Sequence, residues 1–113
     1  MSEWEMYMPK YLVMASYSVE GTKGVLADGG TGRREAIKRE LQSCGGTLEW
    51  MYFAFGEHDL YVVVDMPDNV SMAATSIAAR ASGAVHSKAV PLLSPEDLDA
   101  AAKKQVDYRP PGA

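Results

Sequence analysis

Three predicted β-strands of this chain carry apolar side chains on both of their faces. A strand with one face in water alternates apolar and polar residues, because successive side chains point to opposite sides of the sheet. The segments 10–17, 47–55 and 58–66 do not alternate in this way. Their two sides are, in order, Tyr11, Val13, Ala15 and Tyr17 against Leu12 and Met14; Leu48, Trp50, Tyr52 and Ala54 against Met51, Phe53 and Phe55; and Leu60, Val62 and Val64 against Tyr61 and Val63. The sheet is therefore expected to be covered on both sides.

The remaining helices and strands complete an order that is typical of one fold. Apolar residues at helical spacing predict helices over 33–44 and 70–81, a further apolar run predicts a strand over 84–93, and a short helix follows Ser94. The short Gly56-Glu57 turn predicts a hairpin between the second and third strands. The order is βαββαβ plus a short C-terminal helix. This predicts an α+β, ferredoxin-like fold with a four-stranded antiparallel sheet.

Cap and turn residues mark the ends of the helices. Gly29-Gly30 interrupts the first helical region, and Thr31 is a candidate cap for its second segment. Gly45-Gly46 provides the stop signal for this region. Ser94 and Asp97 stand at the positions of a capping box for the C-terminal helix.

Length sets the domain organisation. A chain of 113 residues leaves no room for two ordinary domains, so we expect a single domain over residues 1–113. Residues 1–8 and 106–113 are predicted to be peripheral tails. Pro91 lies near the end of the fourth strand, which indicates an edge strand or a strand terminus.

One face of this sheet is expected to need a partner. In the ferredoxin-like topology the two main helices cover only one face, so the other exposes either Trp50 with Tyr52 or Phe53 with Phe55. An apolar patch of several hundred Å² on a small protein usually marks an interface or a ligand site. We predict that a second copy packs sheet to sheet, giving a homodimer or higher homo-oligomer. The alternative is that the C-terminal helix and tail fold over this face in a monomer.

Charge and motifs exclude several classes of function. The net charge of −4 argues against a nucleic-acid partner, and no stretch approaches the about 18 apolar residues of a membrane span. The single cysteine, Cys44, cannot form an internal disulfide, and the N-terminal residues lack a leader pattern, so we expect a cytoplasmic protein. The chain has no dinucleotide fingerprint, HExxH, CxxC or nucleophile elbow, so no cofactor is predicted.

The chain resembles the GYD domain family over nearly its whole length. The segments that carry the resemblance are Gly29-Gly30-Thr31-Gly32-Arg33-Arg34-Glu35, Tyr52-Phe53-Ala54-Phe55-Gly56, Met66-Pro67-Asp68-Asn69-Val70 and Pro91-Leu92-Leu93-Ser94-Pro95-Glu96. Where the family has its Gly-Tyr-Asp signature, this chain has Gly56-Glu57-His58-Asp59, so His58 replaces the tyrosine. The resemblance implies an oligomeric, ferredoxin-like α/β-barrel fold, similar to that of small barrel monooxygenases and isomerases, more firmly than it implies a function.

Candidate site residues gather near the hairpin and on the sheet. His58 is a candidate general base or ligand contact, whereas Asp59 is either a ligand contact or a turn residue that accepts backbone N–H groups. His86 on the fourth strand is a candidate ligand contact and could form a two-histidine site with His58 and either Glu57 or Asp59, but two histidines without metal-ligand spacing do not predict a metal site. Trp50 and Tyr52 are candidate ligand contacts on the sheet.

A basic pair lies beside the helix break. Arg33 and Arg34, with Thr31 and free backbone N–H groups at Gly29-Gly30, could hold an anion. The alternative is a solvated arginine pair that contacts nearby glutamates, Glu35 or Glu40.

Three functions remain open. The leading hypothesis is an oligomeric protein that binds a small, partly apolar molecule between sheet and helices or at the dimer seam. The second is a cofactor-independent enzyme, of the monooxygenase or isomerase type, with His58, Tyr61 or Tyr17 as proton carrier. The third is a structural or partner-binding module.

Overall fold

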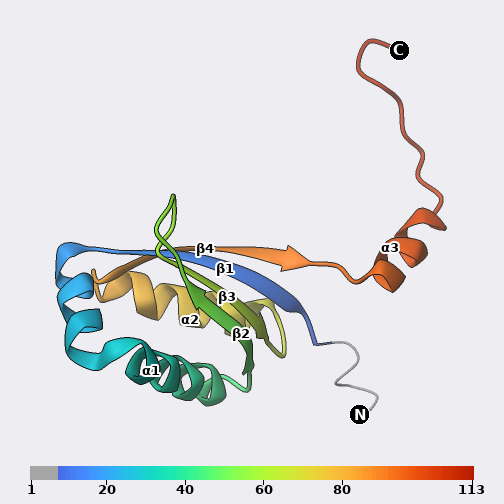
Figure 1. The fold of residues 1–113 in the computed structure, drawn as a ribbon. Helices are drawn as coiled ribbons and strands as arrows, with labels where there is room; N and C mark the ends of the chain where they lie inside the picture. The colour runs from blue at the N-terminus through green and yellow to red at the C-terminus, as the bar shows by residue number, and fades with distance from the viewer. Residues whose placement is uncertain (1–7) are drawn as a thin grey trace.

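The computed structural model describes residues 8–113, so most of the tail predicted over residues 1–8 lies outside the described residues. The elements in chain order are β1 (Lys10–Tyr17), α1 (Val19–Ser43), β2 (Thr47–Phe53), β3 (Leu60–Asp65), α2 (Asn69–Ala81), β4 (Val85–Leu92) and α3 (Pro95–Ala102) (Figure 1). This order confirms the predicted βαββαβ arrangement with an added C-terminal helix.

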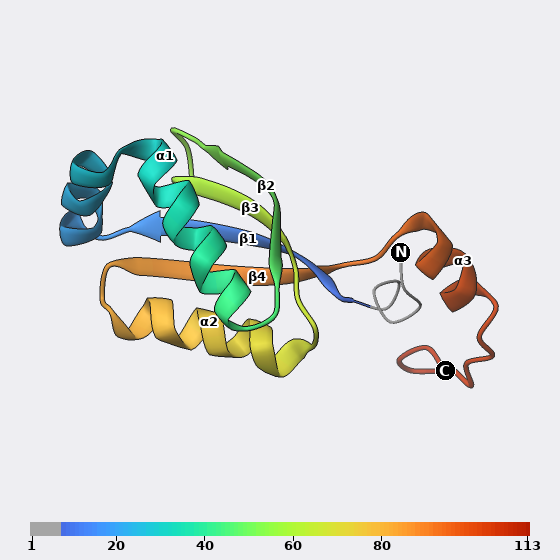
Figure 2. The ribbon, with the colours of Figure 1, turned by 90° about the horizontal axis from the view of Figure 1, so that it is seen from below.

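The four strands form one antiparallel sheet with the order β2-β3-β1-β4. This is the ferredoxin-like arrangement predicted from the sequence. Helices α1 and α2 lie side by side on the same face of the sheet, as Figure 2 shows from the helix side. Strand β4 is an edge strand, in agreement with the position of Pro91.

The hairpin between β2 and β3 is wider than predicted. The sequence suggested strands over 47–55 and 58–66, but β2 ends at Phe53 and β3 begins at Leu60. The Ala54 N–H donates to the Asp59 carbonyl oxygen at 2.9 Å, and this bond closes a loop of which Phe55 is fully exposed. Ala54 and Phe55 are as apolar as the residues of β2, so the apolar pattern gave no sign of where strand pairing stops.

A β-bulge at Glu49 decides which side chains of β2 face the helices. Pairing is regular at Leu48 with Val64, then shifts by one residue before Trp50 pairs with Val63. An extra residue in one strand reverses the face of every residue beyond it. The prediction that Leu48 shares a face with Trp50 is therefore wrong.

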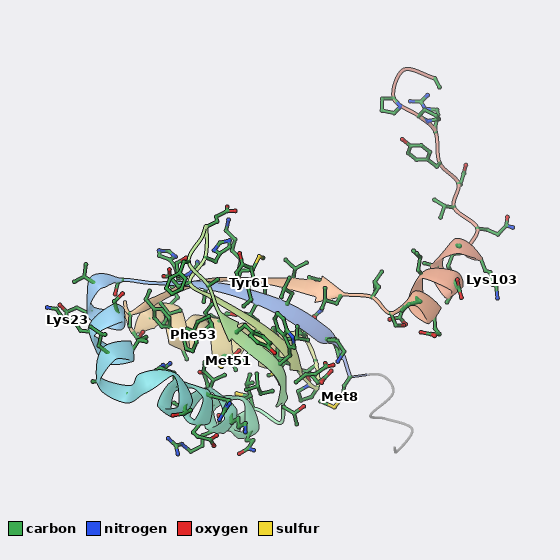
Figure 3. The ribbon with its side chains drawn as sticks, viewed as in Figure 1. Met8, Lys23, Met51, Phe53, Tyr61 and Lys103 are labelled. Carbon is green, nitrogen blue, oxygen red and sulfur yellow. The ribbon has the colours of Figure 1, made fainter. Side chains whose placement is uncertain are left out.

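The bulge leaves Trp50 and Tyr52 on the face away from the helices. Met51 and Phe53 pair with the buried residues Val62 and Leu60 and so point toward the helices. Figure 3 shows Met51 and Phe53 on the helix side of the sheet and Tyr61 on the other side. We call this second side the open face; its residues are Leu12, Met14, Ser16, Trp50, Tyr52, Tyr61, Val63, His86, Lys88 and Val90.

The hydrophobic core fills the space between the sheet and the two helices. Its buried members are Tyr11, Ala15, Leu41, Leu60, Val62, Val64, Met66 and Met72. The members from β1 and β3 stand at every second or fourth position, because side chains two residues apart share a face of the sheet, while Leu41 and Met72 come from α1 and α2. Met66 is completely buried. The core therefore accounts for only one of the two apolar faces of the sheet.

Helix α1 bends sharply at the predicted break. Ser18 is the N-cap of this helix, and its hydroxyl accepts the Gly21 N–H at 3.1 Å. Gly29, with φ of 74° and ψ of 168°, is the one residue inside α1 with non-helical angles, a conformation that a side chain would strain. The helix resumes at once, so Thr31 lies inside the second segment and is not the cap that the sequence suggested.

The C-terminal segment does not fold back over the sheet. Its helix begins with the predicted capping box, in which Ser94 and Asp97 bond each other's backbone N–H at 3.0 Å. Helix α3 then points away from the body, and every residue from Leu93 to Ala113 is exposed (Figure 1). Trp50 and Tyr52 keep 43% and 63% of their surface exposed. The alternative in which this segment covers the open face of its own chain is therefore wrong.

Candidate functional site

A cleft opens between the sheet and the two main helices. It has a free volume of about 90 Å³ and is lined by side chains from β1, β3, α1, α2 and β4. Its walls are mostly apolar and include Val13, Ala15, Ile37, Val62, Val64 and Met72. We call this space the inner cleft. Apolar concave spaces with a few polar groups are the usual form of small-molecule sites.

The inner cleft adjoins a wider and more polar groove. This outer groove has a volume of about 360 Å³ and runs beside the first segment of α1, with Glu20 and Asp28 in its wall. Tyr17, Arg33 and Glu40 line both spaces, so they lie at the junction. A molecule that entered the inner cleft from the outer groove would pass these three side chains.

Two hydrogen-bonding groups at this junction have no partner among the described residues. The hydroxyl of Tyr17 and the Nε of Arg33 are both buried and unpaired. The Arg33 side chain is only 25% exposed, and its Nη1 lies 3.6 Å from Asp28 Oδ2. A buried donor without a partner costs free energy, so such groups are rare in folded proteins. Both residues line the inner cleft, so a rotation of either side chain would let the covered group bond an oxygen atom of a bound molecule.

Glu40 contributes a carboxyl group of altered acidity to the junction. Burial raises the pKa of Glu40, and the positive charge of Arg33 offsets this only in part. A carboxyl group that keeps its proton to higher pH can donate a hydrogen bond as well as accept one. The junction therefore combines a fixed cation, a phenol and a titratable acid.

Replacing Glu40 with glutamine should stabilise the protein at neutral pH and not in acid. Because the folded state binds the Glu40 proton more tightly than the unfolded chain does, stability is lost as the pH rises above the ordinary carboxyl pKa of 4.5. Glutamine stays neutral and removes this loss. The measurement is the melting temperature of both proteins at pH 7 and at pH 4. Glu35→Gln, at an exposed position of α1, is the control, and an equal change for Glu40→Gln at both pH values would contradict the assignment.

The predicted residues His58, Tyr61 and His86 meet on the open face instead. His58 Nδ1 lies 3.4 Å from Ser16 Oγ, and its ring stands edge-on to Tyr61 with 5.8 Å between centroids. His86 pairs with Ser16 from β4. The structure thus brings these side chains to one end of the open face. Tyr17, the other predicted proton carrier, lies on the opposite face at the cleft.

Trp50 and Tyr52 lie on the open face at the β2 edge. Their rings are 5.1 Å apart and tilted by 58°. Adjacent aromatic rings of this kind form a broad apolar surface that water covers poorly. They are 43% and 63% exposed, so this surface is available to a partner or a ligand.

Asp59 holds the hairpin against the central strand. Its carboxylate accepts the Tyr17 N–H at 2.9 Å, and its own N–H donates to the Ala15 carbonyl oxygen at 2.9 Å. These bonds extend the pairing of β1 to Asp59, the residue just before β3 begins. They match the interpretation of Asp59 as an acceptor for backbone N–H groups, and they position Tyr17 at the cleft.

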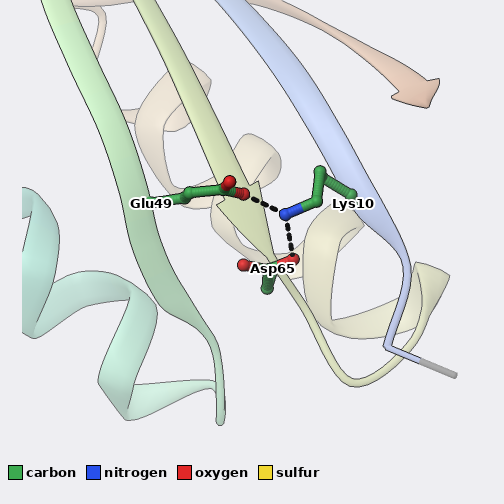
Figure 4. Close-up of polar contacts among 3 residues, drawn as sticks. All are labelled: Lys10, Glu49 and Asp65. Atoms are coloured by element: carbon green, nitrogen blue, oxygen red, sulfur yellow. Dashed lines mark hydrogen bonds and ion pairs between the residues drawn. The ribbon is translucent and has the colours of Figure 1, made fainter. Parts of the chain in front are cut away.

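An ion cluster closes the far end of the open face. Lys10 bonds both Asp65, at 2.8 Å, and Glu49, the residue that the bulge adds to β2 (Figure 4). Burial acts to lower the pKa of Lys10, but the hydrogen bonds to Asp65 and Glu49 outweigh it and raise that pKa. This charged rim marks the limit of the apolar surface.

The two histidines do not form part of a metal cluster. Within residues 8–113, no group of three or more His, Cys, Asp or Glu side chains gathers closely enough to hold a metal ion. The set considered from the sequence, His58 and His86 with Glu57 or Asp59, is not assembled in the described part of the chain.

Arg33 lies in the wall of the cleft and not in a solvated pair with Arg34. Arg34 contacts Glu35, with Nε 3.8 Å from Oε1, as expected for a solvated pair. Arg33 instead turns toward the sheet. The signal was present, because Arg33, Ile37 and Leu41 follow one another at intervals of four residues and so share a face of the helix. The sequence predicted Arg33 as a candidate anion contact beside the helix break and not as part of the wall of a cleft.

Comparisons with known proteins identify a family. A family model described as the GYD domain matches residues 11–102. No curated protein and no solved structure matches the chain. Among the described residues, no helix is long and apolar enough to cross a membrane.

Proposed function

Since the chain belongs to the GYD domain family, we propose that it is a homo-oligomeric protein that binds a small, partly apolar molecule in the inner cleft. The observation that carries this proposal is the pair of buried, unpaired donors, Arg33 Nε and the Tyr17 hydroxyl, beside apolar walls. A ligand that pairs with these donors removes their cost at the same time as it buries apolar surface.

The size and polarity of the cleft limit the ligand. A free volume of about 90 Å³ holds roughly six to nine non-hydrogen atoms, taking about 10–15 Å³ for each water-sized group. The apolar part of the ligand lies against Val62 and Ile37, and an acceptor oxygen meets Arg33. A small aromatic or branched carboxylic acid has this shape and chemistry. Larger ligands would extend into the outer groove.

Replacing Arg33 with glutamine should weaken binding of benzoate, used as the probe, at least about tenfold, because a hydrogen bond to a charged group contributes about 1.5–3 kcal/mol. Arg34→Gln is the matched control. It changes the same residue type one position away, on a side chain that is 51% exposed. Chemical-shift titration of ¹⁵N-labelled protein gives both affinities. It also gives the location, since amide shifts should centre on α1 and β3.

Two results would contradict the cleft assignment. Equal loss of benzoate affinity in Arg33→Gln and Arg34→Gln would mean that the probe responds to net charge only. Amide shifts centred on the open face, near His58 and Trp50, would place the site there. That outcome would support the open-face residues His58, Tyr61, His86, Trp50 and Tyr52 as the ligand contacts.

The oligomer in this proposal forms through the open face. Helices α1 and α2 leave Leu12, Val63 and the Trp50–Tyr52 pair uncovered, and burial of each large apolar side chain is favourable by about 1.5–3 kcal/mol. A second copy offers the same surface. Two such faces can pack around a two-fold axis as aligned sheets do.

A second candidate function is a cofactor-independent proton transfer in the same cleft. The specific observation in its favour is that burial raises the pKa of Glu40 beside the Tyr17 hydroxyl and the Arg33 cation. An acid whose pKa is moved toward neutrality is suited to general acid–base catalysis. Arg33 would stabilise negative charge that develops on a substrate oxygen. If the probe binds but no carbonyl substrate is turned over, only the binding function remains supported.

A further inference from the structure

No residue of the C-terminal arm, Leu93–Ala113, is buried by residues 8–92 of its own chain. We propose that this arm packs against a second copy of the chain and clasps the dimer. The inference rests on the proposed homodimer and adds a further contact to it. Every residue of the arm is exposed, although it contains a well-formed helix.

Helix α3 is too short to persist by itself. It has eight residues, whereas isolated helices below about 12–15 residues are marginal in water. Its capping box and the proline in its first turn select the helical start but do not supply a packing surface. A helix of this length normally depends on tertiary contacts, and none of its residues is buried. Packing against a second copy would supply the contacts that residues 8–92 do not give this helix.

The arm carries apolar side chains that suit such a contact. Leu93, Leu98, Val106 and Tyr108 are spread along it, and each is between 62% and 76% exposed. Single exposed apolar residues are common, but four of them on one projecting segment leave a line of apolar surface in water.

The exposed surface of the whole chain is larger than a stable monomer of this mass presents. The chain exposes 8196 Å², whereas a compact monomer of 12.2 kDa exposes about 6,100 Å². The radius of gyration is 17.0 Å, against about 13 Å for a compact domain of this length. The surplus of about 2,000 Å² exceeds the roughly 800 Å² that each partner buries in a standard interface. A face-to-face dimer clasped by two arms would account for it.

The direction of the arm agrees with this partner. In Figure 1 the helices lie below the sheet, and the arm leaves the end of β4 and turns upward, to the side of the open face. A second copy on the open face would therefore lie within reach of the arm. By two-fold symmetry its own arm would reach back in the same way.

Paramagnetic relaxation between copies tests the inference. A nitroxide is attached to Lys103→Cys in a Cys44→Ala background, so that the single native thiol is not labelled. This nitroxide-labelled protein contains no ¹⁵N and is mixed with ¹⁵N-labelled wild type. We expect signals of the ¹⁵N copy, which carries no nitroxide, to lose intensity at the open face and its rim. A nitroxide at Lys23→Cys, on the exposed outer side of α1, is the control and should leave the open-face signals of the other copy unchanged.

The outcomes separate the inference from the proposal on which it rests. If sedimentation shows a monomer at the concentration used, the homodimer and the clasp both fail. If the chain is dimeric but the ¹⁵N copy shows no broadening, the clasp fails and the dimer stands. If broadening appears only when the nitroxide and the ¹⁵N are on the same chain, the arm folds onto its own body. That result would also overturn the inference.

A substitution gives an independent readout on the full chain. Leu98→Asn should weaken the dimer at least about tenfold in sedimentation equilibrium, because it removes an apolar side chain from the clasp. Asp99→Asn, the neighbouring position, is the matched control and should leave the dimerisation constant unchanged. Equal constants for the two variants would overturn the inference.

Discussion

Replacing Val63 with aspartate is expected to convert the protein to a folded monomer. Val63 lies in the middle of the open face, paired with Leu12 on one side and Trp50 on the other. In the proposed dimer each copy would bury this carboxylate without a partner, at a cost of about 3–5 kcal/mol per charge. The dimer should therefore weaken by a factor of about a thousand or more.

The monomer should tolerate the same change. Val63 is only partly buried on the open face, so the carboxylate can keep part of its hydration. The cost in the single chain is then about 1 kcal/mol, the span of strand propensities, against a typical total of 5–15 kcal/mol. Circular dichroism should show a folded protein, while sedimentation equilibrium at micromolar concentration shows the lower mass.

Val70→Asp is the matched control for this prediction. Val70 lies at the start of α2 and is 79% exposed, away from the open face. The same substitution there should leave the mass unchanged. A Val63→Asp protein that still sediments as the dimer would show that the open face is not the interface.

Replacing Gly21 with alanine is expected to destabilise the fold by about 3 kcal/mol or more. A Cβ atom at this position would stand 2.1 Å from the Ala84 carbonyl oxygen and 3.1 Å from Tyr17 Cδ1. The near contact is backbone, so relief requires movement of α1 away from β4 rather than a rotation of a side chain. The melting temperature should fall by roughly 10 °C or more.

Gly24→Ala provides the opposite result in the same helix. A Cβ atom there meets nothing within 4 Å, so only the helix propensity changes, and alanine should stabilise by about 0.5–1 kcal/mol. Thermal unfolding of both variants measures the contrast. Similar melting temperatures for the two would mean that the close approach of α1 to Ala84 is absent in solution.

Gly21 also connects stability to the site. It lines the outer groove beside Tyr17, and the Ser18 N–H bonds the same Ala84 carbonyl oxygen at 3.0 Å. A shift of α1 here would widen the groove. We therefore expect any Gly21→Ala protein that folds to bind the benzoate probe less tightly than Gly24→Ala.

Local patterns were enough to predict the order of the helices and strands, though not the ends of β2 and β3. The capping box at Ser94 and Asp97, the break at Gly29 and the stop at Gly45-Gly46 each depend on residues within one turn of the chain. Interactions over so few residues are written directly in the sequence. Their order then selects the ferredoxin-like topology, since few arrangements join these elements by short connections.

The position of the site depended on contacts between distant segments. Whether Trp50 or Phe53 faces the helices follows from one bulge at Glu49, which shifts pairing with β3 and cannot be read from β2 alone. Arg33 reaches the cleft only because α1 bends at Gly29 and lies over the sheet beside Tyr17. The sequence indicated a charged pair, and the tertiary structure separated its members.

The two apolar faces of the sheet show this division most clearly. The absence of alternation in the strands determined that both faces need cover, because the side-chain period of a strand is a local property. Which face the helices take, and that the C-terminal arm leaves the other one bare, was decided only by the packing of the whole chain. The reason is that burial depends on neighbours from every part of the chain, whereas the pattern of a strand depends on the strand alone.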